Sequence, residues 1–457
     1  MRRTAKSGLL PEVLGELNFR RYYIGQSLSQ FGDALLPIAM AFAVLDVLGS
    51  ASALGLVLAA GFVPQVILTL FGGVVADRVN RRQLMIACDV LRMGSQALQG
   101  TLLLTGHTNL ITMVVLHGLW GVGAAFFKPS ATGLVAELVD ASKLQQANGL
   151  TGLSSNIAFT LGPALGGVLI VAISPGAAIL IDAATFAASA IALSLIRLPA
   201  TAARTGSRPT ILADLAGGWQ EFRSRTWLWA LVVWAAGFHL LALPAYQILG
   251  PVTAKAELGG VSAWATIGVG TGFGLVLGGV LTLRLKPRFI LRSSFVPLGL
   301  YGLPLLLLAF PHALPGGTVT IAIAALLGNV GVSLFNVMFG TAIQQHVPLD
   351  AISRVSAYDW MGSLALLPVG QAIIGPAAGL TSTRVMLTVG GLYMLGSIPV
   401  LYLIRSARDL PNMLYQVQSA TEATPTPGDV TRKHGDNPAA PDHEADSALQ
   451  GGEQAPA

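Results

Sequence analysis

Long apolar runs separated by short polar breaks are the main pattern of this chain of 457 residues. About 20 apolar residues span a bilayer as a helix. Because unpaired backbone groups are not tolerated in lipid and the runs are too long for barrel strands, they predict membrane-spanning helices. Twelve runs are predicted to be spans: residues 22–47, 52–76, 83–105, 109–136, 146–172, 176–197, 227–250, 262–283, 290–310, 316–344, 356–378 and 384–405.

The longest polar interruption, residues 198–226, divides these spans into six and six. We therefore expect an all-α membrane protein with twelve transmembrane helices in two pseudo-symmetric six-helix bundles, residues 1–197 and 227–410. A cytoplasmic loop at 198–226 would join them, and a polar tail at 411–457 would be disordered and cytoplasmic. In the loop, Trp219 and Phe222 continue an apolar helical repeat. This pattern fits an amphipathic helix on the membrane surface, or an ordinary helix that only tethers the halves.

The composition agrees with a membrane protein, because 53% of the residues are hydrophobic and only 11% are charged. Ordinary water-soluble domains of this length do not have such a composition. The net charge of +5 does not indicate a nucleic-acid partner, since lysine and arginine lie almost wholly on one side of the predicted topology. This asymmetry follows the positive-inside rule and predicts that both termini are cytoplasmic. We expect a multi-pass protein of the inner (plasma) membrane.

The motifs of several enzyme classes are missing. The sequence has no G-x-x-x-x-G-K-S/T phosphate loop, which argues against ATP-driven transport, and no H-E-x-x-H or G-x-S-x-G motif. The single cysteine, Cys88, cannot form an internal disulfide. We expect the protein not to be an enzyme and to need no cofactor or metal.

A charged segment between the second and third spans carries the most specific motif. Residues 73–82 read Gly-Val-Val-Ala-Asp-Arg-Val-Asn-Arg-Arg. This G-x-x-x-D-R-x-x-R-R pattern resembles the signature loop between spans 2 and 3 of the major facilitator superfamily of secondary transporters, with Asn80 in place of the usual glycine. The resemblance implies a gating hairpin whose arginines bind Asp77 or anionic lipid and favour one conformation. Topological anchoring by positive charge is the other interpretation.

The gating hairpin is predicted to include a pair from span 3, because Asp89 and Arg92 share one helix face and would extend its charge cluster. Its predicted members are Gly73, Asp77, Arg78, Arg81, Arg82, Asp89 and Arg92. Gly279, Arg284 and Arg288 repeat the spacing of Gly73, Arg78 and Arg82, as expected if the two halves are related.

Span 5 contains a G-P-x-x-G-G core formed by Gly162, Pro163, Gly166 and Gly167. It resembles the antiporter motif of the superfamily, a feature associated with exporters. Small-residue packing, which is common in any helix bundle, is the alternative interpretation.

Several further segments resemble one branch of the superfamily, the drug:proton antiporter branch that includes macrolide-efflux proteins and the enterobactin exporter. Among these segments are residues 18–20, 25–27, 125–129 and 181–186, and the similarity covers about residues 18–405.

Asp33 is the main candidate for proton coupling. With Gln26 and Gln30 it forms a polar stripe on span 1, as expected for a helix that faces a hydrated cavity. A carboxylate inside a membrane is costly and therefore a functional candidate, although a structural carboxylate bonded to a neighbouring helix fits equally well. His117 is the second candidate, at a position where many drug:proton antiporters have an arginine, because histidine titrates near neutral pH. Asp182 and Asp359 are secondary candidates for helix contacts or gates.

The resemblance implies that spans 1, 4, 7 and 10 line a central cavity. Its lining would be mainly apolar and aromatic, which suits a bulky amphiphilic solute better than a sugar. Lys128 has a second interpretation, in which its ammonium reaches the cytoplasmic interface. The predicted cavity residues are Gln26, Gln30, Trp120, Lys128, Trp234, His239, Tyr246, Asn329, Ser333 and Asn336.

Together these features predict a monomeric exporter of a hydrophobic or amphiphilic small molecule, such as a drug or a macrolide-like natural product. Alternating access would couple export to proton entry, so the expected partners are the small molecule, the proton and the lipid bilayer. Three alternatives remain open: an exporter of a siderophore or another metabolite, an importer, and a non-transporting scaffold or sensor built on a transporter fold.

Overall fold

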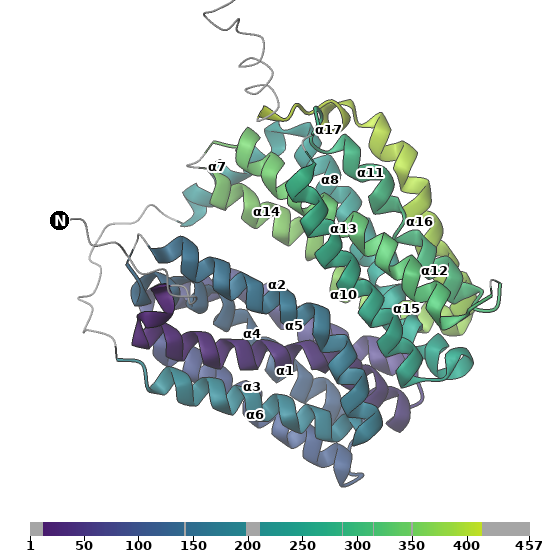
Figure 1. Ribbon diagram of the computed structural model, residues 1–457, viewed down its shortest axis with the longest axis horizontal. Helices are drawn as coiled ribbons and strands as arrows, with labels where there is room; N and C mark the ends of the chain where they lie inside the picture. Colours follow the sequence, from purple (N-terminus) through teal and green to yellow (C-terminus); the bar gives the residue numbers. More distant parts are fainter. Residues whose placement is uncertain are drawn as a thin grey trace, which may run out of the picture. The chain divides into compact units, whose positions relative to one another are not determined.

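The computed structural model describes residues 12–140, 143–197, 211–285, 287–313, 315–348 and 351–413. The chain separates into two units, Met1–Asn412 and Met413–Ala457. The tail predicted to be disordered lies almost wholly outside the described residues. Within those residues the fold is helical, with an isolated β-bridge between Phe289 and Pro411 and no strand (Figure 1).

The first part of the chain forms long helices that follow the predicted spans. A short 3-10 helix, η1, precedes them. The bounds are η1 Glu12–Gly15, α1 Leu17–Val47, α2 Ala51–Arg78, α3 Arg81–Leu104, α4 Leu110–Leu138, α5 Leu144–Ala172 and α6 Pro175–Ser194.

The second part is divided into more pieces, because π-helical turns and interior prolines interrupt it. The π-helical turns η3, η4 and η5 connect α8 to α10. The bounds are α7 Ile211–Ser224, α8 Thr226–Gly237, η3 Phe238–Ala242, η4 Ala245–Leu249, α9 Gly250–Thr253, η5 Ala254–Leu258, α10 Val261–Arg284, α11 Arg292–Gly299, α12 Gly302–Ala309, α13 Thr318–His346, α14 Ile352–Leu364, α15 Leu367–Leu380, α16 Thr383–Leu403 and α17 Arg405–Arg408.

The turn between α2 and α3 consists of only Val79 and Asn80. Asn80 has a φ of −65° and a ψ of 113°, and its side-chain oxygen accepts a hydrogen bond from the backbone N–H of Gln83 at 3.1 Å. The residue that replaces the usual glycine of the motif is therefore the N-cap of α3. Because its φ is negative, this position does not require glycine.

Ten helical segments among the described residues are long and apolar enough to cross a membrane. The number rises to 11 if the two pieces of α5, Gln146–Gly162 and Leu165–Ala172, which meet at 46°, form one span. α3 is not among them, because its 24 residues include both charged and amide side chains. A count of twelve therefore remains a prediction.

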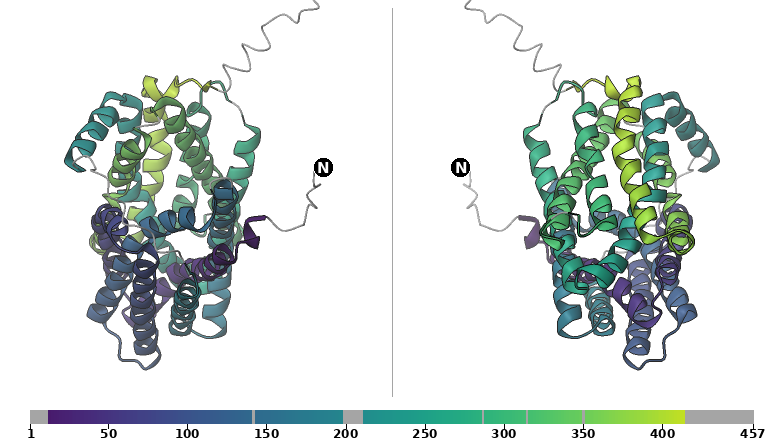
Figure 2. Two further views of the ribbon diagram at one scale, coloured as in Figure 1. Left: turned by 90° about the vertical axis from the view of Figure 1, so that its left-hand side faces the viewer. Right: turned by 90° about the vertical axis from the view of Figure 1, so that its right-hand side faces the viewer.

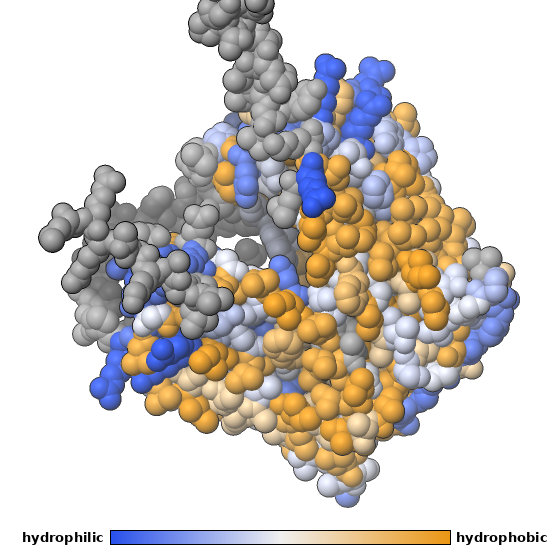
Figure 3. All heavy atoms as spheres, in the orientation of Figure 1, coloured by the Kyte–Doolittle hydropathy of each residue, from blue (hydrophilic) through white to orange (hydrophobic). Residues whose placement is uncertain are grey.

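The helices α1 to α6 pack mainly with one another, and α8 to α16 do the same, as the views of Figure 2 show. In the first group α1 contacts α5 and α6, α2 contacts α4, and α3 contacts α4 and α6. The two groups meet where α2 packs on α15 and where α5 packs on α10. Figure 3 shows apolar side chains over much of the visible face, which is the surface expected against lipid.

Candidate functional site: a buried charge network

Arg92 on α3 lies at the centre of a polar network among α1, α3, α4 and α6. Its guanidinium carbon is 4.2 Å from the ring centroid of Phe127 on α4 and 4.2 Å from that of Phe186 on α6. The residue is only 3% exposed. Contact with aromatic faces stabilises a cation that has left water, so these two rings help to hold the arginine inside the bundle.

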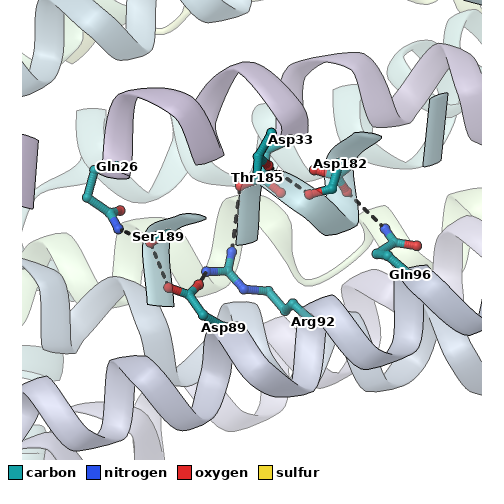
Figure 4. Close-up of polar contacts among 8 residues, drawn as sticks. All are labelled: Gln26, Asp33, Asp89, Arg92, Gln96, Asp182, Thr185 and Ser189. Carbon is teal, nitrogen blue, oxygen red and sulfur yellow. Dashed lines mark hydrogen bonds and ion pairs between the residues drawn. The ribbon is translucent and has the colours of Figure 1, made fainter. Parts of the chain in front are cut away.

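Two aspartates share this guanidinium (Figure 4). Arg92 donates through Nη2 to Oδ1 of Asp89 on α3 at 2.5 Å. Its Nη1 lies 3.6 Å from Oδ2 of Asp33 on α1. The contact with Asp89 is a hydrogen-bonded ion pair, whereas the contact with Asp33 is a looser ion pair. Arg92 therefore connects the acid that the sequence singled out to an acid on a different helix.

Hydrogen bonds extend the network from Asp89 back to α1. The hydroxyl of Ser189 on α6 donates to Oδ2 of Asp89 at 2.7 Å. The amide of Gln26 on α1 donates to the hydroxyl of Ser189 at 2.9 Å. Gln26 is buried and joins α1 to α6 through this bond, and its place in a cavity wall stays a prediction.

Asp182 on α6 is the third aspartate of the network, and its side chain is fully buried. Gln96 on α3 donates to its Oδ2 at 3.3 Å. Oδ1 has no hydrogen-bond partner among the described residues. It lies against Gly32 of α1, the residue before Asp33, where the missing side chain leaves room for it.

The network contains more acids than bases. Asp33, Asp89 and Asp182 surround the single buried guanidinium of Arg92. The side chain of Asp33 is 33% exposed, whereas Asp89 and Asp182 are fully buried. Asp33 is therefore the one acid of these three that is partly exposed, although its Oδ1 is buried.

Asp89 and Arg92 lie away from the turn that begins α3, and their role in the gating hairpin stays a prediction. They lie two to three turns into α3, roughly 12–17 Å along the helix from Arg81, and their partners are Asp33 and Ser189. The i, i+3 spacing correctly placed them on one face, but that face turns into the bundle. The same face continues with Gln96 and Gln99 at i+7 and i+10 from Asp89. This polar repeat is the signal that could have identified Gln96.

The arginines that begin α3 bind groups within the first part of the chain. Arg81 forms an ion pair with Glu137 of α4 at 2.7 Å and donates to the carbonyl of Gly133 at 3.3 Å. Arg82 donates to the carbonyl of Ile196, just after α6. Gly73, Asp77 and Arg78 belong to the last turns of α2, and their side chains lie outside the described part of the chain.

His117 on α4 is buried and stacks on Trp120, with ring centroids 5.0 Å apart and an interplanar angle of 7°. Its ring also packs on Gly61 of α2, at the place where α2 and Gly121 of α4 cross closely. His117 makes no hydrogen bond or ion pair with Asp33 in the described structure. Trp120 does lie beside Asp33. Among the described residues, neither the indole nitrogen of Trp120 nor Oδ1 of Asp33 makes a hydrogen bond with acceptable geometry.

Lys128 on α4 is exposed, and its ammonium lies 5.8 Å from the ring centroid of Trp360 on α14. It also interacts electrostatically with Asp33. Gln30 on α1 is half-buried and accepts a hydrogen bond from Ser155 of α5 at 2.8 Å. Lys128 thus contacts the second part of the chain, while Gln30 contacts the first.

The predicted aromatic residues of the second part form a continuous cluster. Trp234 stacks on Phe238 at 6.1 Å and meets Phe335 edge-on at 5.6 Å. His239 donates through Nδ1–H to the carbonyl of Ala235, 2.8 Å away. Tyr246 is hydrogen-bonded to Thr271 at 2.9 Å and is buried.

The predicted polar stripe on α13 has two different surroundings. Asn329 donates to the carbonyl of Ala325 at 2.8 Å and is buried. Asn329 and Ser333 both face glycines of α10, so they lie in a helix contact and not on an open wall. Asn336 is exposed. Of these three residues, only Asn336 has the exposure expected of a cavity residue.

The glycines of the antiporter-like motif lie in close helix contacts. Gly162 and Gly166 approach α1 at Ala34 and Leu35, and Gly167 approaches Ala265 of α10. Pro163 lies in the bend of α5, and its side chain is outside the described part of the structure. These contacts place the motif between α1 and α10.

A bundle of apolar membrane helices with charged groups buried inside it defines a polytopic membrane transporter. No group of metal-binding side chains is present among the residues that the structure describes. The chain matches the family model described as the Major Facilitator Superfamily over residues 22–366. The protein belongs to this superfamily, which confirms the family inferred from the hairpin motif.

Relatives with assigned names include transporters of two kinds. The multidrug efflux pump Tap of Mycolicibacterium fortuitum is 27% identical over 390 residues, which are 81% of this chain and 91% of Tap. Tap of Mycobacterium tuberculosis H37Rv is 28% identical over 377 residues, which are 78% of this chain and 87% of that Tap. Macrolide efflux protein A of Streptococcus pyogenes is 22% identical over 268 residues, which are 58% of this chain and 66% of that protein.

Solved structures show the same fold. The nucleoside transporter NupG matches with a TM-score of 0.66 and 12% identity, over 85% of this chain and 98% of NupG. A bacterial homologue of the lysosomal transporter Spinster, solved in an inward-facing and unoccupied conformation, matches with a TM-score of 0.65 and 16% identity, over 88% and 98%. At these identities the similarity shows the fold alone.

Proposed function

We propose that this protein exports a hydrophobic or amphiphilic small molecule in exchange for protons, by alternating access. The names of its relatives, multidrug efflux pump and macrolide efflux protein, support export of such compounds. The observation that carries proton coupling is the ion pair between Asp33 and Arg92, in which the acid is partly exposed and the base is buried.

Protonation of Asp33 would change the charge balance of the network. When Asp33 is ionised, it competes with Asp89 for the guanidinium of Arg92. A proton on Asp33 removes that competition and leaves Arg92 paired with Asp89 alone. Because α1 contacts both α5 and α6, the loss of one ion pair changes the relative stability of two arrangements of these helices. A proton can drive a conformational change only through such a difference between states.

The aromatic groups of the proposed cavity suit an apolar solute. Trp120, Trp234 and Tyr246 have large apolar rings with few hydrogen-bonding groups; Trp234 and Tyr246 are buried in the arrangement seen here, and they would line the cavity in the proposed open arrangement, with the exposed Asn336 adding a polar contact. Such linings bind amphiphilic molecules through buried area, whereas a sugar needs many hydrogen bonds. We therefore propose a macrolide-like or other bulky drug as the solute.

The proposed transporter has twelve spans with both termini in the cytoplasm. α3 would be the additional span, because its polar residues face α1 and α6 inside the bundle and not the lipid. A helix can cross a bilayer with charged groups when those groups are paired within the protein.

Transport of labelled erythromycin into inverted membrane vesicles under an imposed pH gradient tests the proposal. Wild type should accumulate the label, and Asp33→Asn should lose at least tenfold in rate while still inserting into the membrane. Asp409→Asn is the matched control, because Asp409 is exposed beyond α17 and should not affect transport. Undiminished gradient-driven transport by Asp33→Asn would contradict proton coupling through this residue.

Counterflow of labelled erythromycin in proteoliposomes separates a transporter from a scaffold. An exchanger loaded with unlabelled erythromycin should accumulate the label transiently, whereas a scaffold should not. Tetracycline and ethidium provide a second and a third probe of different chemistry. Failure of all three probes in counterflow would contradict export of drug-like amphiphiles.

A further inference from the structure

Asp182 differs from the other two acids of the network in its partners. Asp89 receives hydrogen bonds from Arg92 and Ser189, and Asp33 has an ion pair with Arg92. The side chains beside Asp182 are neutral donors, the amide of Gln96 and the hydroxyl of Thr185, and within the described structure Asp182 has no direct contact with a cation. It is nevertheless fully buried.

The charged groups that face Asp182 come from two of the helices packed against α6. Asp33 on α1 repels a negative charge on Asp182, and Arg92 on α3 attracts it. Asp89 on α3 already holds Arg92 at 2.5 Å. Lys128 on α4 acts on Asp33. One guanidinium cannot neutralise three carboxylates, and an uncompensated buried charge is strongly unfavourable.

We infer that Asp182 is a second proton-carrying group of the transporter. It lies deeper inside the helix bundle than Asp33 and exchanges a proton with it. This inference rests on the proposed proton-coupled function. In this proposal Asp182 is the neutral acid and Asp33 the carboxylate paired with Arg92, in the arrangement that the contacts describe. Asp33 connects the network with solvent, and Asp182 stores the proton away from solvent.

The transfer is a simple exchange between two carboxyl groups. The O–H bond at Oδ1 of Asp182 breaks and an O–H bond forms at Oδ1 of Asp33, so Asp182 becomes the carboxylate and Asp33 becomes neutral. Both oxygens are buried, and within the described residues neither makes a hydrogen bond in the arrangement seen here. The indole of Trp120 lies beside Asp33 and the hydroxyl of Thr185 lies beside Asp182. The total charge of the network does not change, but Arg92 loses its ionised partner on α1.

Gln96 is a positioning residue for this exchange. By donating to Oδ2 of Asp182, it directs Oδ1 toward Gly32 on α1. A side chain at Gly32 would occupy the place of Oδ1 and of the Thr185 hydroxyl. The close approach of α1 and α6 at this glycine therefore brings the acid next to Asp33.

Infrared spectroscopy of the full-length protein in lipid at pH 7 tests the inference without any solute. Wild type should show the C=O stretching band of a protonated carboxylic acid, and Asp182→Asn should lose it. Asp46→Asn is the control, because Asp46 is an exposed carboxylate and its removal should leave the band unchanged. A band that survives in Asp182→Asn, or no band in wild type, would overturn the inference.

A transport measurement distinguishes a proton site from a structural acid. Asp182→Asn should reduce gradient-driven erythromycin transport at least tenfold but retain counterflow, because counterflow needs no net proton movement. Asp182→Glu, which restores an acid, should recover part of the gradient-driven rate. Loss of counterflow together with the gradient-driven rate would assign Asp182 a structural role and overturn the inference. If wild type shows the infrared band but no gradient-driven transport, the proposed function fails and the assignment of the proton stands.

Discussion

Lys255 and Asp46 form an ion pair that joins the two groups of helices. The ammonium of Lys255, in η5, binds the carboxylate of Asp46 near the end of α1 and also donates to the carbonyl of Leu45. In the proposed alternating access the helices on both sides of this pair separate. The pair would therefore stabilise the arrangement in which these helices are together at this end of α1.

Removal of the ion pair should favour opening at this end of α1. Both side chains are roughly half exposed, so the pair contributes only about 0.2–1 kcal/mol, or up to about a fivefold change in the ratio of the two states. Lys255→Gln should change the erythromycin efflux rate by no more than this factor. Exchanging the charges, with Asp46→Lys and Lys255→Asp together, should restore the wild-type rate. If the charge-exchanged double variant has the same efflux rate as Lys255→Gln, the ion pair is not the cause of the change.

Replacement of Arg92 should destabilise the protein strongly. Arg92→Gln leaves the buried Asp89 without its charged partner, which costs about 3–5 kcal/mol. The midpoint of thermal unfolding of the purified protein should fall clearly. The double variant Arg92→Gln with Asp89→Asn should recover part of the loss, because it also removes the unpaired charge. Equal midpoints for the single and the double variant would argue against this ion pair as the cause.

Arg92→Lys should not substitute for the native residue. An ammonium keeps the positive charge but cannot offer a planar group to Phe127 and Phe186 while binding two acids. We expect an unfolding midpoint between those of wild type and Arg92→Gln. A midpoint equal to that of wild type would show that charge alone is sufficient at this position.

Gly121→Ala should destabilise the contact between α2 and α4. A methyl group at this position would overlap the backbone of Gly61, and overpacking of this kind costs about 1–3 kcal/mol. Gly94→Ala on α3 is the matched control, because its methyl group would meet open space and alanine is the better helix former by about 1 kcal/mol. The midpoint of thermal unfolding of Gly94→Ala should be equal to or higher than that of wild type, and the midpoint of Gly121→Ala should be lower. The reverse order would contradict the close crossing of these helices.

The ion pair between Lys143 and Glu16 should depend on pH at the alkaline end. Lys143 donates to Glu16 at 2.6 Å, and this hydrogen bond raises the pKa of Lys143 above its ordinary value of 10.5. A raised pKa means that the contribution to stability is complete below that value and disappears as the pH rises through the pKa in the folded state. The unfolding midpoints of wild type and Lys143→Met should therefore converge above about pH 10.5. A difference that persists unchanged at higher pH would exclude the ion pair as its origin.

Much of the fold could be predicted from local sequence. Apolar runs predicted the positions of α1, α2, α4, α5 and α6, because a helix in lipid must satisfy its own backbone and present apolar side chains, whereas α3 also carries charged and amide residues. The second part was harder, since the π-helical turns begin at Phe238 inside the predicted span 227–250 and continue past its end to Leu258. Hydropathy does not report the hydrogen-bond pattern of the helix.

The site was predictable only as a set of candidates. Helical spacing placed Asp89 with Arg92, and Gln26 with Asp33, on common faces, as the structure has them. It did not say what each face meets. Gln26 meets Ser189, and Arg92 meets Phe127 and Phe186, all from distant parts of the sequence.

By itself the sequence determined that this is a helical membrane protein of the superfamily, because hydropathy and a ten-residue motif are local properties. Only the tertiary structure decided which charges act together. It brought Asp33, Arg92 and Asp182 from three helices into one buried network, while His117 packs on Gly61 and Trp120. Electrostatic interactions depend on distance and burial in space, and neither can be obtained from the order of residues along the chain.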